Sequence, residues 1–552
     1  MAELKPYKVY FLSLTMLLFA CSSIRIKLTN GVLLKVDQYQ VPVLRGSEQN
    51  PVLHLTLIPV EDNIPILKEI EINMEGQYGL RNIKSVRMHI VDSKNNTTLS
   101  EQFGVELNPE NKLVFKDHRV IEDTIQLVLS IQLKDTADLL NSYRVSCEKI
   151  LTTEGMAEPD SSFSPLTLRE GLGLRNHMDD NVHTYRIPGI TTTSTGTLLA
   201  IYDIRHDSAR DLQGNVDIGL SRSTDGGNTW EPMQKVLDMG EWGGLPEKFN
   251  GVSDACILVD KNTNTIYVAG LWMHGVINSN GDWVEGLTQS SSDWNHQWRN
   301  KGSQSGFGVK ETSQFLLTKS TDDGQTWSEP INLTRQCKKE EWWLWAPAPG
   351  HGITLTNGTL VLPTQGRDRN GRSFSNITWS NDGGDTWNTS NVASHGTTEN
   401  MVVQLTDGSL MLNARDGKNK GNTSDQNGRV ISITRDLGET WTEHGTSRGA
   451  LVEPACMASL HKHEYHNDGQ KKSILLFSNP NSKTSRNRMT IKVSFDDGKT
   501  WPEEYWLLLD EKRGRGYSCI TSIDEQTIGI LYEGSRADMT FQKIRLSEIL
   551  KK

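Results

Sequence analysis

An eight-residue turn motif recurs five times in this sequence and limits what the chain can fold into. The motif reads Ser/Thr-x-Asp-x-Gly-x-Thr-Trp, and each copy is called an Asp box below. One copy would indicate only a turn, whereas five copies spaced by roughly 50 to 100 residues indicate a repeat architecture. The five Asp boxes lie at 223–230, 320–327, 380–387, 434–441 and 494–501.

The chemistry of the first Asp box predicts a tight turn between two strands. The residues before it, 216–220, alternate as in a half-buried strand. Asp225 can accept hydrogen bonds from the backbone of its own turn, and Gly227 can adopt a conformation that other residues resist. Trp230 supplies a large apolar side chain that can anchor the turn.

A second repeat begins at about residue 171. A short strand that ends at a Gly, Asn or Asp turn, followed by a more apolar strand, occurs six times. Six units of about four strands each predict an all-β fold with a six-bladed β-propeller. The last unit lacks an Asp box, and we expect the segment around 166–168 to complete it and close the ring. The first strands are predicted at 185–190, 252–259, 351–355, 400–405, 457–460 and 517–523.

The N-terminal residues 1–21 have the layout of a secretory signal, with Lys5 and Lys8 ahead of an apolar run. The run ends Leu-Phe-Ala-Cys-Ser-Ser, which resembles the lipobox of bacterial lipoproteins, so Cys21 is a lipidation candidate. The alternatives are ordinary cleavage or a buried N-terminal helix. Either form of export predicts a periplasmic, outer-membrane or extracellular protein, attached to a membrane only through a lipidated Cys21.

Residues 22–155 carry no Asp box and alternate like the strands of a small β-sandwich. This position, ahead of a propeller, favours a carbohydrate-binding module, with a spacer or packing domain as the alternative. Residues 156–170, rich in Pro, Ser and acidic residues, are predicted to be a linker. The propeller domain then covers 171–552.

Composition excludes several classes of partner. The net charge of −10 argues against nucleic acid binding, which calls for a basic face. The five cysteines after Cys21 are scattered and predict neither a disulfide framework nor a metal site. The motif His461-x-His463-x-x-His466 lacks a Cys or carboxylate partner at ligand spacing, so no metal and no cofactor is expected. A monomer is expected.

The direction of the strands predicts where functional side chains lie. If first strands start at one face of the propeller, second strands return to it and the Asp boxes lie at the opposite face. Several positions at the predicted functional face are arginines, whose guanidinium groups bind carboxylates through paired hydrogen bonds. These positions are Arg186, Asp254, His351, Glu399, Glu453 and Tyr517 on first strands, Arg205, Arg367, Arg415 and Glu533 on second strands, and Arg486 further along the fifth unit.

The sequence Tyr-Arg-Ile-Pro at 185–188, followed by Asp boxes, resembles the bacterial exo-α-sialidases (neuraminidases), especially the secreted Bacteroides-type enzymes. The resemblance runs over 171–552. It implies a retaining glycosidase that releases terminal sialic acid from glycoproteins, glycolipids or oligosaccharides through a tyrosyl-enzyme intermediate. Three arginines hold the sialic acid carboxylate in that family. Arg186, Arg415 and Arg486 match them, with Arg488 as the alternative for the third.

The resemblance also implies the catalytic roles. Tyr517 matches the nucleophile, Glu399 its base, and Asp211 the general acid and base. A neutral phenol suits this substrate because the anomeric carbon bears a carboxylate that would repel a carboxylate nucleophile. Since a phenol has a pKa of about 10, a carboxylate must accept its proton. The other implied substrate-binding residues are Glu533, which orients the first arginine, and Arg205 and Asp254, which contact the sugar 4-hydroxyl.

Three alternatives compete with this interpretation. A non-catalytic Asp-box propeller that binds glycans or proteins could lack Tyr517, Glu399 or Asp211, yet all three are present. A glycosidase acting on neutral polysaccharide would have paired carboxylates without an arginine cluster. A trans-sialidase would use the same residues with a sugar as acceptor, and no motif separates it from a hydrolase. Linkage preference also stays open.

Overall fold

Strands make up nearly all of the regular secondary structure in a computed structural model, which describes residues 26–29, 32–60, 64–91, 99–212, 214–293 and 301–550. The α-helices in these ranges are single turns, α1 (Thr334–Cys337) and α2 (Leu546–Ile549). The predicted all-β class is confirmed. No helix among the described residues has the length and apolarity to span a bilayer. The predicted signal and Cys21 lie outside the described residues.

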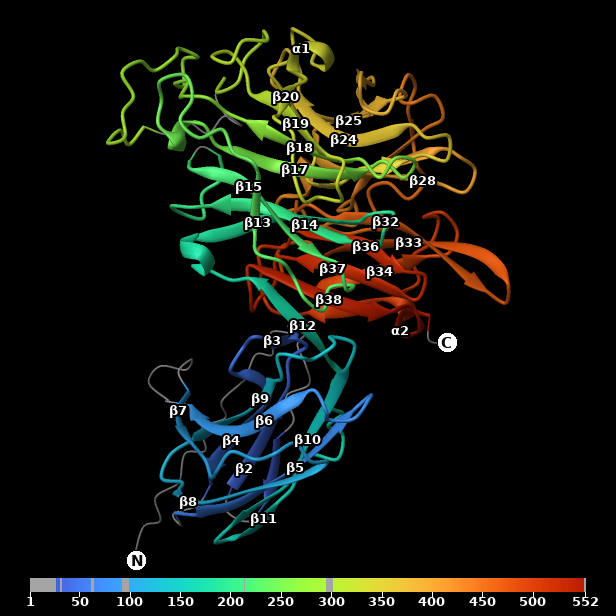
Figure 1. The fold of residues 1–552 in the computed structure, drawn as a ribbon. Helices are drawn as coiled ribbons and strands as arrows, with labels where there is room; N and C mark the ends of the chain where they lie inside the picture. Colours follow the sequence, from blue (N-terminus) through green and yellow to red (C-terminus); the bar gives the residue numbers. More distant parts are fainter. Residues whose placement is uncertain are drawn as a thin grey trace, which may run out of the picture.

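The N-terminal part consists of two sheets that share one core (Figure 1). The first sheet has the order β1 (Ile26–Thr29), β2 (Val32–Asp37), β4 (Asn50–Pro59), β9 (Ile125–Leu133), β6 (Ile83–Val91) and β7 (Leu99–Gln102). The second has the order β10 (Ser142–Thr152), β5 (Ile66–Gly76) and β8 (Lys112–Val120), with β11 (Gly155–Ala157) paired to β10.

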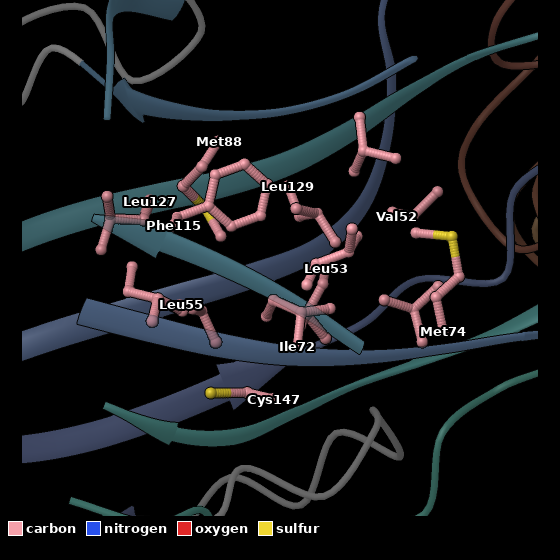
Figure 2. Close-up of a cluster of buried hydrophobic side chains, with 14 of the residues drawn as sticks. Val52, Leu53, Leu55, Ile72, Met74, Met88, Phe115, Leu127, Leu129 and Cys147 are labelled. Atoms are coloured by element: carbon pink, nitrogen blue, oxygen red, sulfur yellow. The ribbon is translucent and has the colours of Figure 1, made fainter. Parts of the chain in front are cut away.

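Alternation along the strands builds this core. In β2, buried and half-buried residues alternate without a break, because successive side chains of a strand point to opposite faces. Figure 2 shows Leu53 and Leu55 of β4 beside Ile72 of β5 and Phe115 of β8, all almost completely buried. Each such side chain contributes about 1.5–3 kcal/mol by leaving water.

The two parts of the molecule are joined by strand pairing. Strand β12 (Leu168–Arg175) pairs with β10 at one end and with β38 (Met539–Arg545) at the other, so one sheet runs through both parts. The stretch predicted as a linker, 156–170, overlaps β11 and the start of β12. Strand β3 (Val43–Arg45) also pairs with β12, and Arg45 donates to the carbonyl oxygen of Asn228 at 2.6 Å. The N-terminal part is therefore fixed against the first Asp box.

The larger part contains six antiparallel sheets in chain order (Figure 1). The first two are β13 (Thr184–Thr192), β14 (Leu198–Arg205), β15 (Val216–Ser223) and β16 (Gln234–Leu237), then β17 (Val252–Val259), β18 (Ile266–Trp272), β19 (Gln314–Ser320) and β20 (Ile331–Asn332). The third has β21 (Leu344–Pro347), β23 (Ile353–Thr354), β24 (Leu360–Arg367), β25 (Ser373–Ser380), β26 (Asn388–Thr389) and β27 (Ser394–His395).

The remaining three sheets repeat the same meander. They are β28 (Thr397–Gln404), β29 (Leu410–Asp416), β30 (Val430–Thr434) and β31 (Thr442–Glu443); β32 (Ser459–Asn467), β33 (Gln470–Pro480), β34 (Met489–Ser494) and β35 (Leu507–Asp510); and β36 (Ser518–Asp524), β37 (Thr527–Tyr532) and β38, with β12 as the fourth strand.

Two of the strand predictions need correction. The first strand of the third sheet, predicted as one strand at 351–355, is divided in two. Its first part, β22 (Gly350–His351), pairs in parallel with β17 of the second sheet. The strand that completes the last sheet lies slightly later than 166–168. Its pairing with β38 begins at Leu172, whereas Leu168 pairs with Tyr143 of the N-terminal part.

The Asp boxes lie in the turns between third and fourth strands, as predicted. In the first box, the carboxylate of Asp225 accepts hydrogen bonds from the backbone nitrogen and hydroxyl of Thr229, at 2.8 and 2.7 Å. The other four boxes repeat both bonds. Trp230 packs edge-on against Phe541 of the last sheet, with ring centroids 5.2 Å apart. The box thus closes its own turn and contacts the neighbouring sheet.

Alanine at Gly384, in the third Asp box, is expected to destabilise the protein more than alanine at Gly383. Both glycines have positive φ, 88° and 69°, so each substitution incurs about 1–2 kcal/mol of backbone strain. A Cβ at Gly384 would also lie 2.6 Å from the hydroxyl oxygen of Tyr267, whereas one at Gly383 meets nothing within 4 Å. The clash adds about 1–3 kcal/mol. Calorimetry should give Gly384→Ala the lower Tm, and equal Tm values would contradict this packing.

Candidate active site

Local breaks in three first strands mark the functional face. The pairing of β13, β17 and β28 with their second strands shifts register between Arg186 and Gly189, Ser253 and Cys256, and Thr397 and Asn400. Such bulges bend a strand and redirect its side chains. The breaks occur at Arg186, Asp254 and Glu399. Ile187 and Asp254 have φ values of 60° and 57°, strained for residues with a Cβ, as is common at functional sites.

Tyr517 and Glu399 are in direct contact at this face. The Tyr517 hydroxyl donates a hydrogen bond to Glu399 Oε1, and both side chains are buried. Arg415 Nη1 lies 2.6 Å from Glu399 Oε2 and 3.1 Å from the Tyr517 hydroxyl oxygen. Burial and the charge of Glu399 raise the pKa of Tyr517 well above its ordinary value, against the opposing effect of Arg415 and Arg486. The phenol is therefore protonated at neutral pH, with its proton directed at a carboxylate.

Three arginines surround the Tyr517 side chain. The guanidinium carbons of Arg186 and Arg486 lie 5.2 and 5.5 Å from its ring centroid, and Arg415 contacts its hydroxyl. Arg486 Nη1 is held at 2.9 Å by the carbonyl oxygen of Arg515. Arg488, by contrast, is exposed and lies near Glu511. The structure thus brings Arg486 to the same place as the other two arginines.

Glu533 forms hydrogen bonds with two members of this cluster, Arg186 and Tyr517. Its Oε1 accepts hydrogen bonds from Arg186 Nε at 2.8 Å and from the backbone nitrogen of Ile187 at 3.1 Å. Its Oε2 accepts from Arg186 Nη2 at 3.2 Å and from the backbone nitrogen of Tyr517 at 3.0 Å. Burial opposes ionisation of Glu533, but Arg186 and these hydrogen bonds outweigh it and lower its pKa. One carboxylate therefore positions both Arg186 and Tyr517.

Asp211 and Arg205 form a second polar group beside these residues. Arg205 is almost fully buried, and its Nη2 lies 2.8 Å from Asp203 Oδ2 and 3.1 Å from Asp211 Oδ1. Asp211 is about half exposed, with 49 % of its side chain accessible. Burial, together with the charges of Asp211, Glu399 and Asp203, raises the pKa of Asp254 well above its ordinary value.

The comparison with known proteins identifies the family. Residues 32–154 match the family described as "N-terminal domain of BNR-repeat neuraminidase", and residues 187–509 match the family described as "BNR repeat-like domain". A sialidase of Bacteroides fragilis is 39% identical over 94% of this chain and 95% of its own length. The chain belongs to the BNR-repeat neuraminidase family. It is accordingly a glycoside hydrolase of the exo-α-sialidase type, and the predicted similarity to Bacteroides-type enzymes is confirmed.

Other relatives support the same family. An exo-alpha-sialidase of Aspergillus fumigatus is 29% identical over 70% of this chain and 83% of its own length. Among solved structures, the Hadza microbial sialidase Hz136 has a TM-score of 0.83 at 34% identity and covers 93% of this chain and 100% of its own. That structure therefore shares both parts of the molecule.

Sequence reasoning missed one buried residue of this neuraminidase site, Asp203. Its carboxylate accepts from Arg205 and from the Ser253 hydroxyl at 2.7 Å. Burial, opposed by Arg205 and Ser253, raises the pKa of Asp203 to about 6. A signal was available, because Asp203 and Arg205 are two residues apart on β14 and so share one face of the strand.

Three other residues predicted at the functional face of this neuraminidase form contacts with neighbouring residues outside the Tyr517 cluster. Glu453 forms a fully buried ion pair with Arg429 at 2.6 Å. His351 lies against His461, and Arg367 donates to the carbonyl oxygen of Gly371 at 3.2 Å.

The three histidines of the motif at 461–466 also form hydrogen bonds with neighbouring side chains. His461 and His463 both hydrogen-bond the Ser522 hydroxyl, at 2.9 and 2.8 Å, and His466 pairs with Glu525.

One acidic group among the described residues has the spacing of a cation site, namely Asp217, Asp238 and Glu247. The ammonium of Lys235 lies 2.7 Å from Asp217 and 3.1 Å from Asp238. A lysine therefore supplies the positive charge that these carboxylates require.

Proposed function

We propose that this neuraminidase releases terminal sialic acid from glycoconjugates with retention of configuration, through a covalent bond to Tyr517. The observation that carries the proposal is the contact of the Tyr517 hydroxyl with Glu399, with Arg186, Arg415 and Arg486 around it. An isolated tyrosine of this kind would be a packing residue. Its pairing with a carboxylate inside a ring of cations is the arrangement that an anionic sugar requires.

The three arginines bind the carboxylate of the substrate. Guanidinium groups match carboxylates in geometry and charge, and burial strengthens the attraction. This contact places the anomeric carbon above Tyr517. The sugar ring then extends toward Arg205 and Asp254, on the first two sheets, where we place its 4-hydroxyl.

In the first chemical step, Glu399 accepts the phenolic proton while the Tyr517 oxygen bonds to the anomeric carbon. The bond from that carbon to the leaving oxygen breaks, and Asp211 gives this oxygen a proton. The neutral phenol avoids the repulsion that a carboxylate nucleophile would meet. Asp211 suits its role because its side chain is about half exposed, so that a leaving group and water can both reach its carboxylate.

In the second step, Asp211 removes a proton from water and the water oxygen bonds to the anomeric carbon. The bond to Tyr517 breaks, and the phenolate recovers its proton from Glu399. Two displacements at one carbon restore the original configuration. Arg415 contacts both Glu399 and Tyr517, so it stabilises the negative charge wherever it resides in this pair.

We further propose that the six sheets are the blades of a closed six-bladed propeller. Support comes from contact between the first and last sheets, where the Thr192 hydroxyl donates to the carbonyl oxygen of Ser522 at 2.6 Å. Export through residues 1–21, action as a monomer, and lipidation at Cys21 or cleavage beside it are proposed from the sequence alone.

Proton NMR of the first product tests the mechanism. Incubation with an aryl α-sialoside is expected to release α-sialic acid first, with the β-anomer appearing only by later mutarotation. Addition of lactose, a sugar acceptor, should leave free sialic acid as the main product if water is the natural acceptor. Initial release of the β-anomer would contradict the retaining mechanism, and the absence of release from every sialoside would contradict the proposed activity.

A further inference from the structure

Loop 511–516 leads directly from β35 to Tyr517 and forms no strand of its own. On the side of the active site, it is bonded to one of the three site arginines. The carbonyl oxygen of Arg515 accepts a hydrogen bond from Arg486 Nη1 at 2.9 Å. The backbone nitrogen of Gly514 donates to the carbonyl oxygen of Arg486 at 3.1 Å. The loop therefore holds both the guanidinium and the backbone of Arg486.

Close packing at Gly516 adds to this contact. Gly516 has a φ of 92°, which favours glycine. A Cβ added there would lie 3.0 Å from Arg486 Cβ and 3.1 Å from Cys456 Sγ. The loop backbone thus approaches Arg486 about as closely as a residue without a Cβ allows. The place of the Arg486 guanidinium beside Tyr517 depends on where this loop lies.

The same loop contacts the N-terminal part, through the segment that follows β2. The backbone nitrogen of Glu511 donates to the carbonyl oxygen of Gln40 at 2.7 Å. The ammonium of Lys512 lies 3.1 Å from the centroid of the Tyr39 ring, which is a cation–π contact. Gln40 is buried, and its amide donates to the carbonyl oxygen of Thr167 at 2.8 Å, so this segment is itself fixed.

Tyr517 has further anchors outside this loop. Its backbone nitrogen donates to Glu533 and its hydroxyl to Glu399. A displaced loop should therefore misplace Arg486 before it misplaces the nucleophile. The expected signature is weaker binding of the sialic acid carboxylate, with little change in the chemical step.

We propose that the N-terminal part positions a residue of the active site. Tyr39 and Gln40 hold loop 511–516 in place, and the loop keeps Arg486 beside Tyr517. This inference rests on the proposed function, in which Arg486 binds the substrate carboxylate. Tyr39 is a positioning residue, because it acts on the substrate only through the loop and Arg486. Since the loop is ordered before the substrate arrives, less conformational entropy is lost on binding.

The test is Tyr39→Leu in the intact chain, which removes the aromatic ring from the exposed Lys512. KM for an aryl sialoside should rise about two- to fivefold, the factor that corresponds to an exposed cation–π contact. The change in kcat should be less than about 1.5-fold, because a loss of uniform binding raises KM alone. Tyr39→Phe keeps the ring over Lys512 and should retain the wild-type KM.

Arg486→Gln supplies the second arm of a double-mutant cycle. In that variant the guanidinium that the loop positions is absent, so adding Tyr39→Leu should change KM by less than about 1.5-fold. A tyrosine that only stabilised the N-terminal part would raise KM by the same factor in both backgrounds, and that result would overturn the inference. If Arg486→Gln by itself leaves KM unchanged, the proposed carboxylate site fails, and this inference fails with it.

Tyr78→Leu is the matched control. The Tyr78 ring is also in the N-terminal part and lies against a cation of the larger part, with the guanidinium carbon of Arg545 4.5 Å from its centroid. Arg545 is the last residue of β38 and does not belong to loop 511–516. Both leucine variants should lower Tm, but only Tyr39→Leu should raise KM. An unchanged KM in Tyr39→Leu, or an equal rise in Tyr78→Leu, contradicts the proposal while leaving the proposed function intact.

Discussion

Replacement of Tyr517 by phenylalanine is expected to abolish sialoside hydrolysis, with kcat reduced by about 10³- to 10⁶-fold, as when other covalent nucleophiles are removed. The ring of Tyr517 packs in a core with Ile187, Met401 and Phe477, and phenylalanine preserves these contacts. Only the hydroxyl is lost, and with it the bond-forming atom. Because the three arginines remain, substrate binding should persist. The measurement is kcat and KM on an aryl sialoside, with a binding titration of the variant.

Tyr532→Phe provides the control for this prediction. Tyr532 is fully buried at the end of β37, in the last sheet, and its hydroxyl donates a hydrogen bond to Gln542 at 3.1 Å. The chemical change is identical, but the hydroxyl that is lost is the one bonded to Gln542 rather than the one that contacts Glu399. Its activity should stay near that of the wild type, with a stability loss of about 1 kcal/mol for the missing bond. More than a tenth of wild-type activity in Tyr517→Phe would rule out the tyrosyl intermediate.

Replacement of Glu533 by glutamine is expected to have the second-largest effect, on both activity and stability. Each oxygen of Glu533 accepts two hydrogen bonds, one from Arg186 and one from a backbone nitrogen. A glutamine NH₂ at either position would face two donors, and Arg186 would lose the charge that compensates its own. Breaking such a buried pair costs about 3–5 kcal/mol, and a misplaced Arg186 and Tyr517 should lower kcat/KM about 10²-fold.

Glu548→Gln separates the two effects. Glu548 is also buried and pairs with Arg169 at 3.1 Å, but near the C-terminus and away from the site. This variant should lower Tm and leave kcat/KM on an aryl sialoside unchanged. Glu533→Gln should lower both, and a kcat/KM within about threefold of the wild type would show that Glu533 does not position the site.

Much of the fold was predictable because its signals are local. The Asp boxes are short and repeat the same hydrogen bonds, so five copies revealed the repeat and the turns that they occupy. Strand alternation predicted most first strands within a few residues. The prediction for the first strand of the third sheet was wrong because part of that strand pairs with β17 of the preceding sheet. Pairing with a strand of another sheet does not change the local alternation of residues, so the sequence pattern does not reveal it.

The candidate site was predictable only as a set of residues. Arg186, Glu399, Arg415, Arg486 and Tyr517 lie far apart in the chain, yet the structure brings all of them into contact. The register breaks that expose them, and the left-handed conformation of Ile187 and Asp254, were not foreseen. Sequence spacing does not encode such backbone strain, which only surrounding packing can maintain.

By itself, the sequence determined the repeat, the all-β class and the chemical types at the functional face, because these depend on side-chain identity and short-range periodicity. The tertiary structure alone decided which of those side chains meet. It paired Tyr517 with Glu399, brought Arg486 beside the Tyr517 ring, and paired Glu453 with Arg429. Contacts between distant residues depend on how the sheets pack, and no local pattern specifies that arrangement.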